Sequence, residues 1–189
     1  MSAFQFRQAR RCVQGGGVIA YPTEAVYGLG CDPLNFEAVQ RLLHIKQRPI
    51  SKGLILIASH FQQLRPYLIE PETSLLQQAL DSWPGPYTWL FPARAQTPHW
   101  LTGTHDSIAV RVTAHPIASR LCDELGTALV STSANVNQRP PARSALECRL
   151  RCPGYDCLLP GAVDRQSSPS TIRDIISGET LRAGGSTTK

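Results

Sequence analysis

The chain alternates short apolar runs with longer amphipathic segments over most of its 189 residues, and this alternation constrains its fold more than any other feature. Apolar runs of strand length occupy residues 18–21, 54–58, 87–91, 107–113 and 128–131. Apolar residues recur at helical spacing at 4–14, from 36 to no further than 48, at 71–82 and at 116–124. Strands that alternate with helices in this way predict a twisted α/β sheet with helices packed on it.

Capping residues mark where several helices begin and end. Ser2, Asn35 and Ser144 each precede a helical segment and can accept a hydrogen bond from its first turn. Pro49 must end the second helix, because the residue before a proline is driven toward an extended conformation. We therefore expect a helix to start after each of these three residues, and the helix after Ser144 to be the last one in the chain.

The sequence predicts one domain. Short strands are expected near 157–159 and 170–174, and no internal repeat or linker interrupts the sequence. We predict a single domain over residues 1–183 and a flexible tail at 184–189.

Composition narrows the broad class of protein. The apolar fraction of 42% and the charged fraction of 17% are ordinary for a globular protein. No run approaches the ~18 apolar residues of a membrane helix. The first residues, MSAFQFRQARRC, lack the apolar core of a secretory signal, so we expect a cytoplasmic protein.

Six cysteines are scattered along the chain without a Cys-x-x-Cys pair: Cys12, Cys31, Cys122, Cys148, Cys152 and Cys157. In a cytoplasmic protein such cysteines are expected to be free thiols. The spacing of the last three matches no common zinc pattern, so we predict no metal site built from the protein's own side chains.

The distribution of charge along the chain is more informative about possible ligands than the net charge of +5. Residues 38–69 contain no Asp or Glu, and neither do residues 82–105. Surfaces usually mix both signs of charge. Acid-free stretches of this length predict a face that meets an anion, which could be phosphate, carboxylate or nucleic acid.

The strongest candidate for anion binding is the segment Lys46-Gln47-Arg48-Pro49-Ile50-Ser51-Lys52-Gly53. The chain has only three lysines against sixteen arginines, and two of the three lie here. Lys is a compact charge that can follow a polyphosphate, while Arg can bind one phosphate in a bidentate manner. The alternative is a solvated basic loop, but a helix C-terminus would account only for Lys46. We predict that Lys46, Arg48 and Lys52 bind a polyphosphate.

Three further segments carry polar groups next to expected strands. Ser131 to Asn135 (STSAN) follows an apolar strand, and ligands of open α/β sheets lie at such strand ends. Taken alone, this segment is explained slightly better by a Ser/Thr-rich turn. Thr23 and Glu24 lie in a segment, 21–30, that could also be an ordinary turn. Arg111 is the only charge in its apolar strand, so it either pairs with an acid or holds a ligand carboxylate.

The sequence gives less support to other kinds of binding site and to other functions. Residues 15–20 fit Gly-x-Gly-x-x-Ala, but a strand follows where a dinucleotide-binding turn needs a helix, and no Gly-Lys pair forms a P-loop. A serine hydrolase built on Ser131 or Ser133 would lack the Gly-x-Ser-x-Gly elbow. A non-catalytic RNA-binding module should interleave aromatic and basic residues, yet no aromatic residue lies between 40 and 60.

Taken in order along the chain, these motifs closely resemble the YrdC-like threonylcarbamoyl-AMP synthase family, in its short single-domain bacterial branch. The segments that carry the resemblance are 21–30, 46–52, Trp83-Pro84-Gly85-Pro86, Asp106 to Val112, Ser131 to Asn135, Ser170-Thr171-Ile172 and Leu181-Arg182. Each motif alone is weak, and their order and spacing make the set specific.

The resemblance implies an open, twisted, mixed sheet flanked by helices, with a basic concave face. It also implies an enzyme that forms threonylcarbamoyl-AMP and pyrophosphate from L-threonine, bicarbonate or CO₂, and ATP. The product would serve the t6A modification of tRNAs that read ANN codons, through a downstream threonylcarbamoyl-transferase complex. Mg²⁺ would arrive with ATP, and weak tRNA binding is compatible with this activity.

The resemblance also implies roles for particular residues. Lys46, Arg48 and Lys52 would bind the triphosphate and act in catalysis. The remaining assignments are ATP binding by Asn135 and Arg182, threonine binding by Thr23, Arg111, Ser133 and Thr171, and closure of the site by Ser170, Thr171 and Arg182. Because the reaction needs no covalent nucleophile, these residues would act by positioning and electrostatics.

The sequence departs from the family pattern at a few positions. Many members have Thr where this chain has Ala25. Members of a longer branch have Asn-Pro in place of Lys52-Gly53, His in place of Ile57, and an additional C-terminal domain. Threonine contacts of that branch therefore cannot be transferred to Ala25 and Ile57.

Overall fold

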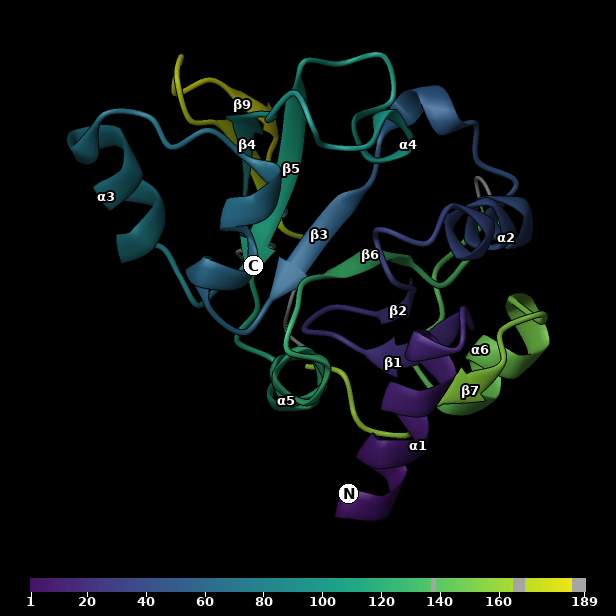
Figure 1. Cartoon of the computed structure of the whole chain (residues 1–189). Coiled ribbons are helices and arrows are strands. Elements are labelled where there is room, and N and C mark those ends of the chain that lie inside the picture. Colours follow the sequence, from purple (N-terminus) through teal and green to yellow (C-terminus); the bar gives the residue numbers. More distant parts are fainter. Residues whose placement is uncertain (137–138, 165–168, 185–189) are drawn as a thin grey trace.

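The computed structural model describes residues 1–136, 139–164 and 169–184 (Figure 1). Within these ranges the α-helices are α1 (Ala3–Gln14), α2 (Phe36–Lys46), α3 (Thr73–Asp81), α4 (His99–Thr102), α5 (Pro116–Leu125) and α6 (Ala145–Arg151). Short 3₁₀ helices are η1 (Ile50–Lys52), η2 (Phe61–Gln63) and η3 (Arg65–Tyr67). Of the predicted tail at 184–189, all but Gly184 lies outside the described residues.

None of the helices in the described part of the chain has the length and apolar character needed to cross a membrane.

Nine strands of the described residues form one sheet. They are β1 (Ile19–Pro22), β2 (Tyr27–Gly30), β3 (Ile55–Ala58), β4 (Tyr87–Pro92), β5 (Ser107–Val112), β6 (Leu129–Ser133), β7 (Cys157–Leu158), β8 (Thr171–Asp174) and β9 (Thr180–Arg182). Their order is β7-β1-β2-β6-β3-β5-β4-β8-β9. The pairs β1–β7, β3–β5 and β4–β8 are parallel and the others antiparallel, which confirms the predicted mixed α/β sheet flanked by helices.

The predicted helix starts are confirmed by their hydrogen bonds. Ser2 Oγ accepts a bond from Gln5 N, and Gln5 Oε1 accepts one from Ser2 N, so that α1 begins with a capping box. Asn35 and Ser144 cap α2 and α6 in the same sense. The sequence places Phe4, with Ala9 and Val13, on the apolar face of this helix, but in the structure Phe4 is 57% exposed and Phe6 is buried instead.

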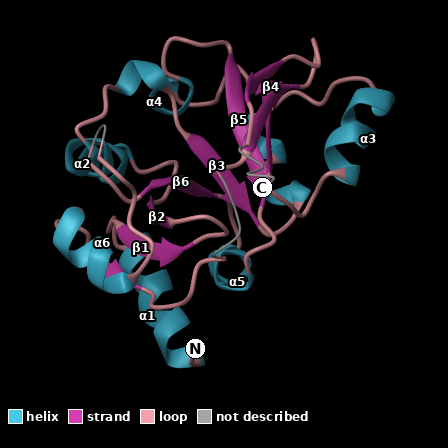
Figure 2. Cartoon of the chain, turned by 180° about the vertical axis from the view of Figure 1, so that it is seen from behind, coloured by secondary structure: helices cyan, strands magenta, loops and turns pink. Residues whose placement is uncertain are grey.

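Helices cover the two faces of the sheet unequally. On one face, α1 and α5 lie side by side and bury an apolar cluster against β1, β3 and β6 (Figures 1 and 2). The opposite face carries the larger core, against which α2, α3 and α6 pack. Neighbouring strand residues therefore enter different cores, as Leu129 and Val130 of β6 do.

The face under α1 and α5 continues beyond these helices and carries the candidate site. Ser131 lies two residues beyond Leu129 on β6, and Ile55 lies two residues before Ile57 on β3, so these pairs share a face. Leu129 and Ile57 are fully buried with α1 and α5, whereas Ser131 and Ile55 border a cavity. The extent of the helix layer thus decides where the sheet stays accessible.

The hairpin β1–β2 was not predicted, because β2 contains two glycines and little apolar pattern. In the structure, Tyr21 of β1 extends across β2 and reaches Ser131 of β6, where the two hydroxyl oxygens are 2.8 Å apart. A Cβ atom on Gly30 would lie 2.9 Å from Tyr21 Cε1, and one on Gly28 would lie 3.3 Å from Tyr21 Cζ. Both glycines of the motif therefore provide the space that the buried tyrosine ring occupies.

Replacing Gly30 with Ala should destabilise the protein. The new Cβ would approach Val130 O to 2.5 Å and the Tyr21 ring to 2.9 Å, so the backbone must shift. We expect a loss of at least about 2 kcal/mol in the free energy of urea-induced unfolding. Gly126→Ala is a control with a left-handed φ of 71° and no atom within 4 Å, and it should cost only roughly 1 kcal/mol. Equal losses in the two variants would contradict this packing role.

Candidate active site

A cavity of about 670 Å³ lies on the accessible part of the sheet, within the size range of small-molecule sites. Its floor comes from β6, β3, β5 and β4, and its walls come from the 23–28 segment, η1 and the β8–β9 hairpin. Both acid-free segments predicted to meet an anion contribute to the lining. Among the residues that the structure describes, the lining contains four Lys or Arg residues (Arg48, Lys52, Arg111 and Arg182) and no Asp or Glu.

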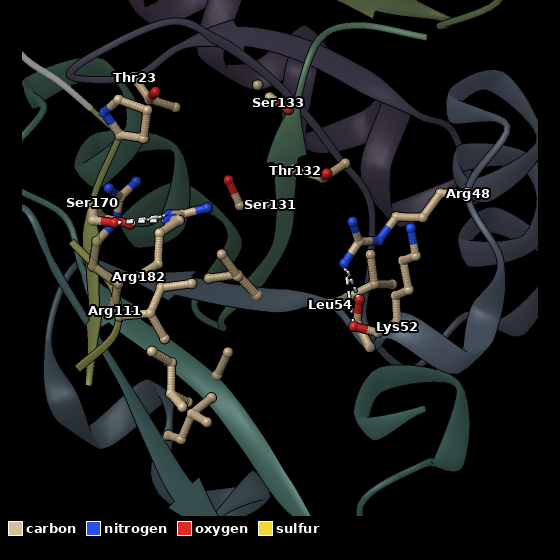
Figure 3. Close-up of a pocket in the computed structure, with 18 of the residues that line it drawn as sticks. Thr23, Arg48, Lys52, Leu54, Arg111, Ser131, Thr132, Ser133, Ser170 and Arg182 are labelled. Carbon is tan, nitrogen blue, oxygen red and sulfur yellow. Dashed lines mark hydrogen bonds between the residues drawn. The ribbon is translucent and has the colours of Figure 1, made fainter. Parts of the chain in front are cut away.

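The four cations form two groups on opposite sides of the cavity (Figure 3). Arg48 and Lys52, which we call the η1 cations, lie on one side. Arg111 and Arg182, which we call the paired arginines, lie on the other. Ser131 lies on the floor between the two groups. A ligand that spans the cavity can therefore place one anionic group at each end.

The η1 cations are positioned by the backbone around η1. Arg48 Nη2 donates to the carbonyl oxygens of Lys52 and Gly53, at 3.2 and 3.0 Å. Burial lowers the pKa of Arg48 below its ordinary value, although the guanidinium stays charged at any physiological pH. Lys52 is exposed and remains available to a ligand. The loop needs Gly53, because a Cβ there would lie 2.9 Å from Thr102 O.

The paired arginines are anchored differently. Arg111 Nη2 lies 3.2 Å from Glu24 Oε2, and the two side chains are only 11% and 13% exposed. Glu24 Oε1 accepts hydrogen bonds from Thr113 Oγ1 at 2.7 Å and from Ala114 N at 3.1 Å. Burial alone would raise the pKa of Glu24, but Arg111 and the Thr113 bond outweigh it, so the pKa is lowered. Of the two alternatives for Arg111, internal pairing with an acid is what the structure contains.

Arg182 lies beside Arg111 and binds the start of β8. Its guanidinium donates to Ser170 O, with a shortest distance of 2.8 Å, and to Ser170 Oγ at 3.1 Å. Burial, and then the charge of Arg111, lower the pKa of Arg182. Ser170 lines the cavity and also bonds Thr88 Oγ1 at 2.9 Å. The prediction grouped Arg182 with the ATP-binding cations, but it lies across the cavity from them (Figure 3).

Lys46 does not line the cavity, in contrast to Arg48 and Lys52. Its ammonium group is buried at the end of α2 and donates to Ser133 O, Asn135 O and Asn135 Oδ1. Burial lowers the pKa of Lys46 to about 8. This lysine therefore ties the segment after β6 to α2, which is a different placement from the direct phosphate contact that the sequence predicted.

The other predicted site residues are Ser133, Asn135, Thr23 and Thr171, and only some of them line the cavity. Ser133 and Thr23 line the cavity. The Asn135 side chain accepts bonds from Lys46 and Ser133 and donates to Arg139 O, so its polar atoms are used within the loop. Thr171 lies outside the cavity lining, and its Oγ1 accepts a bond from Gly184 N at 3.0 Å.

Ala25 and Ile57, to which threonine contacts of the longer branch cannot be transferred, differ in location. Ala25 lines the cavity, whereas Ile57 is fully buried beneath α5 and does not.

Ser131 and His105 are two of the cavity-lining residues for which the sequence predicted no role in binding. Ser131 was part of a quoted motif without a role of its own in the site, although alternation along β6 places it on the same face as Ser133. His105 lines the wall near η1, where Thr104 N and Thr104 Oγ1 both bond Ser51 O. No local signal distinguishes His105 from the other histidines.

All six cysteines lie in the described part of the chain and are free thiols, as predicted; Cys148 and Cys152 are buried. Among the described residues, no group of three or more His, Cys, Asp or Glu side chains is arranged to hold a metal ion.

The family model for Sua5, YciO and YrdC proteins, described as "Telomere recombination", matches residues 11–184. The chain belongs to this family. A curated relative from Alkalilimnicola ehrlichii, named threonylcarbamoyl-AMP synthase, is 53% identical over 184 residues, which cover 95% of this chain and 96% of the relative. A relative from Nitrosococcus oceani with the same name is 52% identical over 180 residues, covering 95% of this chain and 97% of that protein.

Solved structures of Sua5/YciO/YrdC proteins share the fold. The structure of P. abyssi Sua5 complexed with L-threonine superposes with a TM-score of 0.90 at 32% identity. The match covers 98% of this chain but only 55% of the Sua5 chain. E. coli YciO superposes with a TM-score of 0.82 at 26% identity, covering 95% of this chain and 88% of that protein.

The different placements of Lys46 and Lys52 predict different effects on stability. Lys46→Ala removes a buried donor from three oxygen acceptors and should lower the free energy of unfolding by about 2 kcal/mol or more. Lys52→Ala changes an exposed side chain and should alter it by less than about 0.5 kcal/mol. Urea denaturation of both variants measures the contrast, and equal stabilities would contradict the tethering role of Lys46.

Proposed function

We propose that this protein is a threonylcarbamoyl-AMP synthase that joins L-threonine, bicarbonate or CO₂, and ATP. The observation that carries the proposal is one cavity with two separate cationic groups on opposite sides of a floor that has a hydroxyl at its centre. The two substrates need such an arrangement, since one ends in phosphates and the other in a carboxylate. Relatives at 52–53% identity named threonylcarbamoyl-AMP synthase, and a related Sua5 structure with L-threonine, support it.

ATP binds with its phosphates at the η1 cations in this proposal. Arg48 provides a planar donor held by backbone carbonyls, and Lys52 provides a mobile point charge. Mg²⁺ enters as part of the MgATP substrate, because phosphate oxygens suit it and the described residues offer no acidic cluster. When bound, it neutralises part of the triphosphate charge.

Threonine binds with its carboxylate at the paired arginines. Glu24 offsets one of the two positive charges there, so about one net positive charge faces one carboxylate. Ser133 donates its hydroxyl hydrogen to Asn135 Oδ1, at 2.6 Å, and its oxygen accepts a longer bond from Lys46 Nζ, at 3.4 Å, so that one lone pair is left for the cavity. Such an acceptor suits the hydroxyl or amine hydrogens of threonine. Thr23, at the edge of the same pocket, is oriented by its bond to Val26 O.

The reaction balances without a protein nucleophile. The uncharged amine of threonine adds to CO₂ and releases a proton, or reacts with bicarbonate and releases water, to give a carbamate. A carbamate oxygen then attacks the α-phosphorus of ATP. The bond from this phosphorus to the bridging oxygen breaks, and pyrophosphate leaves with the bonding electrons. The η1 cations stabilise the charge that moves onto the leaving group.

Four residues receive revised roles. Lys46 and Asn135 act by holding the loop after β6, so that Ser133 keeps its orientation. Arg182 joins Arg111 on the amino-acid side of the cavity rather than the nucleotide side. Thr171 supports the β8–β9 wall from outside the cavity.

The product would pass to a threonylcarbamoyl-transferase complex for t6A modification of tRNA, which completes the proposed role. A purely RNA-binding function is not favoured, because Tyr27 and His105 are the only aromatic rings among the described residues that line the cavity. Direct contact with tRNA remains secondary to catalysis in this proposal.

Pyrophosphate release by the purified protein tests the proposed function. Release should require L-threonine, bicarbonate and ATP together. Lys52→Ala should lower the rate by on the order of 10²-fold, because a charge at the reacting phosphates is lost. Release that continues without threonine would refute the function, and a loss below threefold in the variant would refute the role of Lys52.

Steady-state kinetics of Arg182→Gln separate the two sides of the cavity. We expect the KM for threonine to rise about tenfold or more, because a charged partner of the carboxylate is lost, with the KM for ATP changed less than twofold. Arg173→Gln is a matched control on the neighbouring strand, whose guanidinium stacks over the Trp89 ring outside the cavity lining. A larger effect of Arg182→Gln on ATP than on threonine would restore the original assignment.

A further inference from the structure

Ser131 occupies the floor of the cavity between the two cationic groups (Figure 3). By strand register, Ile55 of β3 pairs with both Ser131 and Ala109, and Ala109 pairs with Leu90 of β4. These four side chains form one strip that crosses the sheet beneath the cavity. Ser131 is the only residue of the strip with a polar side chain, and it is 7% exposed.

The direction of the Ser131 hydroxyl is fixed by a buried partner. Tyr21 is fully buried, and burial raises its pKa, so the phenol keeps its proton and donates it to Ser131 Oγ at 2.8 Å. Ser131 accepts this bond and keeps its own hydrogen for an acceptor. Since Ser131 lines the cavity, a bound ligand can supply that acceptor. Ser133, two residues along, is oriented in the opposite sense because its hydrogen goes to Asn135.

The reach of Tyr21 depends on the glycines of β2. Tyr21 pairs with Gly28, and its ring passes over both Gly28 and Gly30 to reach β6. A side chain at either glycine would compete for the volume of the ring. Tyr21, Gly28, Gly30 and Ser131 therefore act as one unit that presents a hydrogen-bond donor to the middle of the cavity.

We propose that Ser131 is a catalytic residue that donates a hydrogen bond to the carbamate formed on threonine, and that Tyr21 is its positioning residue. This inference rests on the proposed function. If the threonine carboxylate lies at the paired arginines and the phosphates lie at the η1 cations, the carbamate that joins them lies over the strip. Ser131 is the polar group of the strip that can bind it.

The hydrogen bond fits the oxygen that does not attack. A bond to this oxygen fixes the plane of the carbamate and turns the other oxygen toward the α-phosphorus of ATP. A bond to the attacking oxygen would lower its nucleophilicity. Ser131 exchanges no proton in this step. The carbamate oxygen already carries the electron pair that forms the new bond, and pyrophosphate leaves as an anion that needs no proton from Ser131.

A double-mutant cycle on threonine-dependent pyrophosphate release tests the unit. Ser131→Ala should lower kcat by about 10- to 100-fold with the KM for ATP changed less than twofold. Tyr21→Phe should lower kcat by a smaller factor and should have no further effect in the Ser131→Ala background, because it acts only through Ser131. The inference is overturned if Ser131→Ala keeps more than half of the wild-type kcat, or if the two losses multiply.

Two control variants and a stability measurement exclude general damage to the fold. Tyr67→Phe removes the hydroxyl of another buried tyrosine, whose partner is Thr127 and which does not line the cavity. Ser119→Ala removes a hydroxyl from α5, also outside the cavity lining. Both should keep wild-type kcat. Urea unfolding shows whether Tyr21→Phe and Ser131→Ala remain folded under the assay conditions.

Calorimetric binding separates failure of this inference from failure of the proposed function. The probes are L-threonine and N-carbamoyl-L-threonine, a stable mimic with a carbonyl oxygen at the carbamate position. Ser131→Ala should weaken N-carbamoyl-L-threonine about fivefold or more and leave L-threonine unchanged. Equal effects on both probes, or on neither, overturn the role of Ser131 alone. Wild-type protein that binds neither probe and releases no threonine-dependent pyrophosphate overturns the proposed function as well.

Discussion

Four cations surround one cavity, and none of the described residues that line it is an acid. The mutual repulsion of these cations is the constraint that the local structure has to satisfy. Arg48 and Arg182 each donate to nearby backbone carbonyl oxygens. Arg111 pairs with Glu24, which lies just outside the lining and is itself held by hydrogen bonds from Thr113 and Ala114, directly after β5. The positive charge is thus fixed in place, and Glu24 offsets only the part of it that Arg111 carries.

The same arrangement makes the cavity preorganised. The guanidinium groups are partly buried and held by backbone or carboxylate oxygens, so little reorientation is needed when an anion binds. Burial lowers the pKa of Arg48 and of Arg182, because the charged form is less favourable away from water. This cost of burial is offset when phosphate and carboxylate groups bring negative charge into the site. Folding and ligand binding are coupled through this electrostatic term.

The part of the fold that this chain shares with Sua5 is sufficient to build both sides of the cavity. The chain covers 55% of the Sua5 chain and aligns over 98% of its own length. One side comes from η1, which follows α2. The other comes from β5 and from the β8–β9 hairpin at the end of the described chain. The sheet order brings these segments, far apart in sequence, around one floor.

The sequence by itself determined most of the secondary structure, the α/β class, the segments that form the cavity and the family. These properties have local causes: the spacing at which apolar residues repeat, capping residues such as Ser2 and Asn35, and motifs of a few residues. It missed β2, because a strand containing Gly28 and Gly30 carries almost no apolar pattern.

Only the tertiary structure decided which polar side chains face the cavity. Lys46 lies in the same motif as Lys52, yet it points to the loop after β6, because acceptors 87 and 89 residues away converge on it. Ser131 receives its bond from Tyr21, 110 residues away in the chain. The direction of a polar group depends on the partners that strand pairing brings to it, and a short motif does not contain those partners.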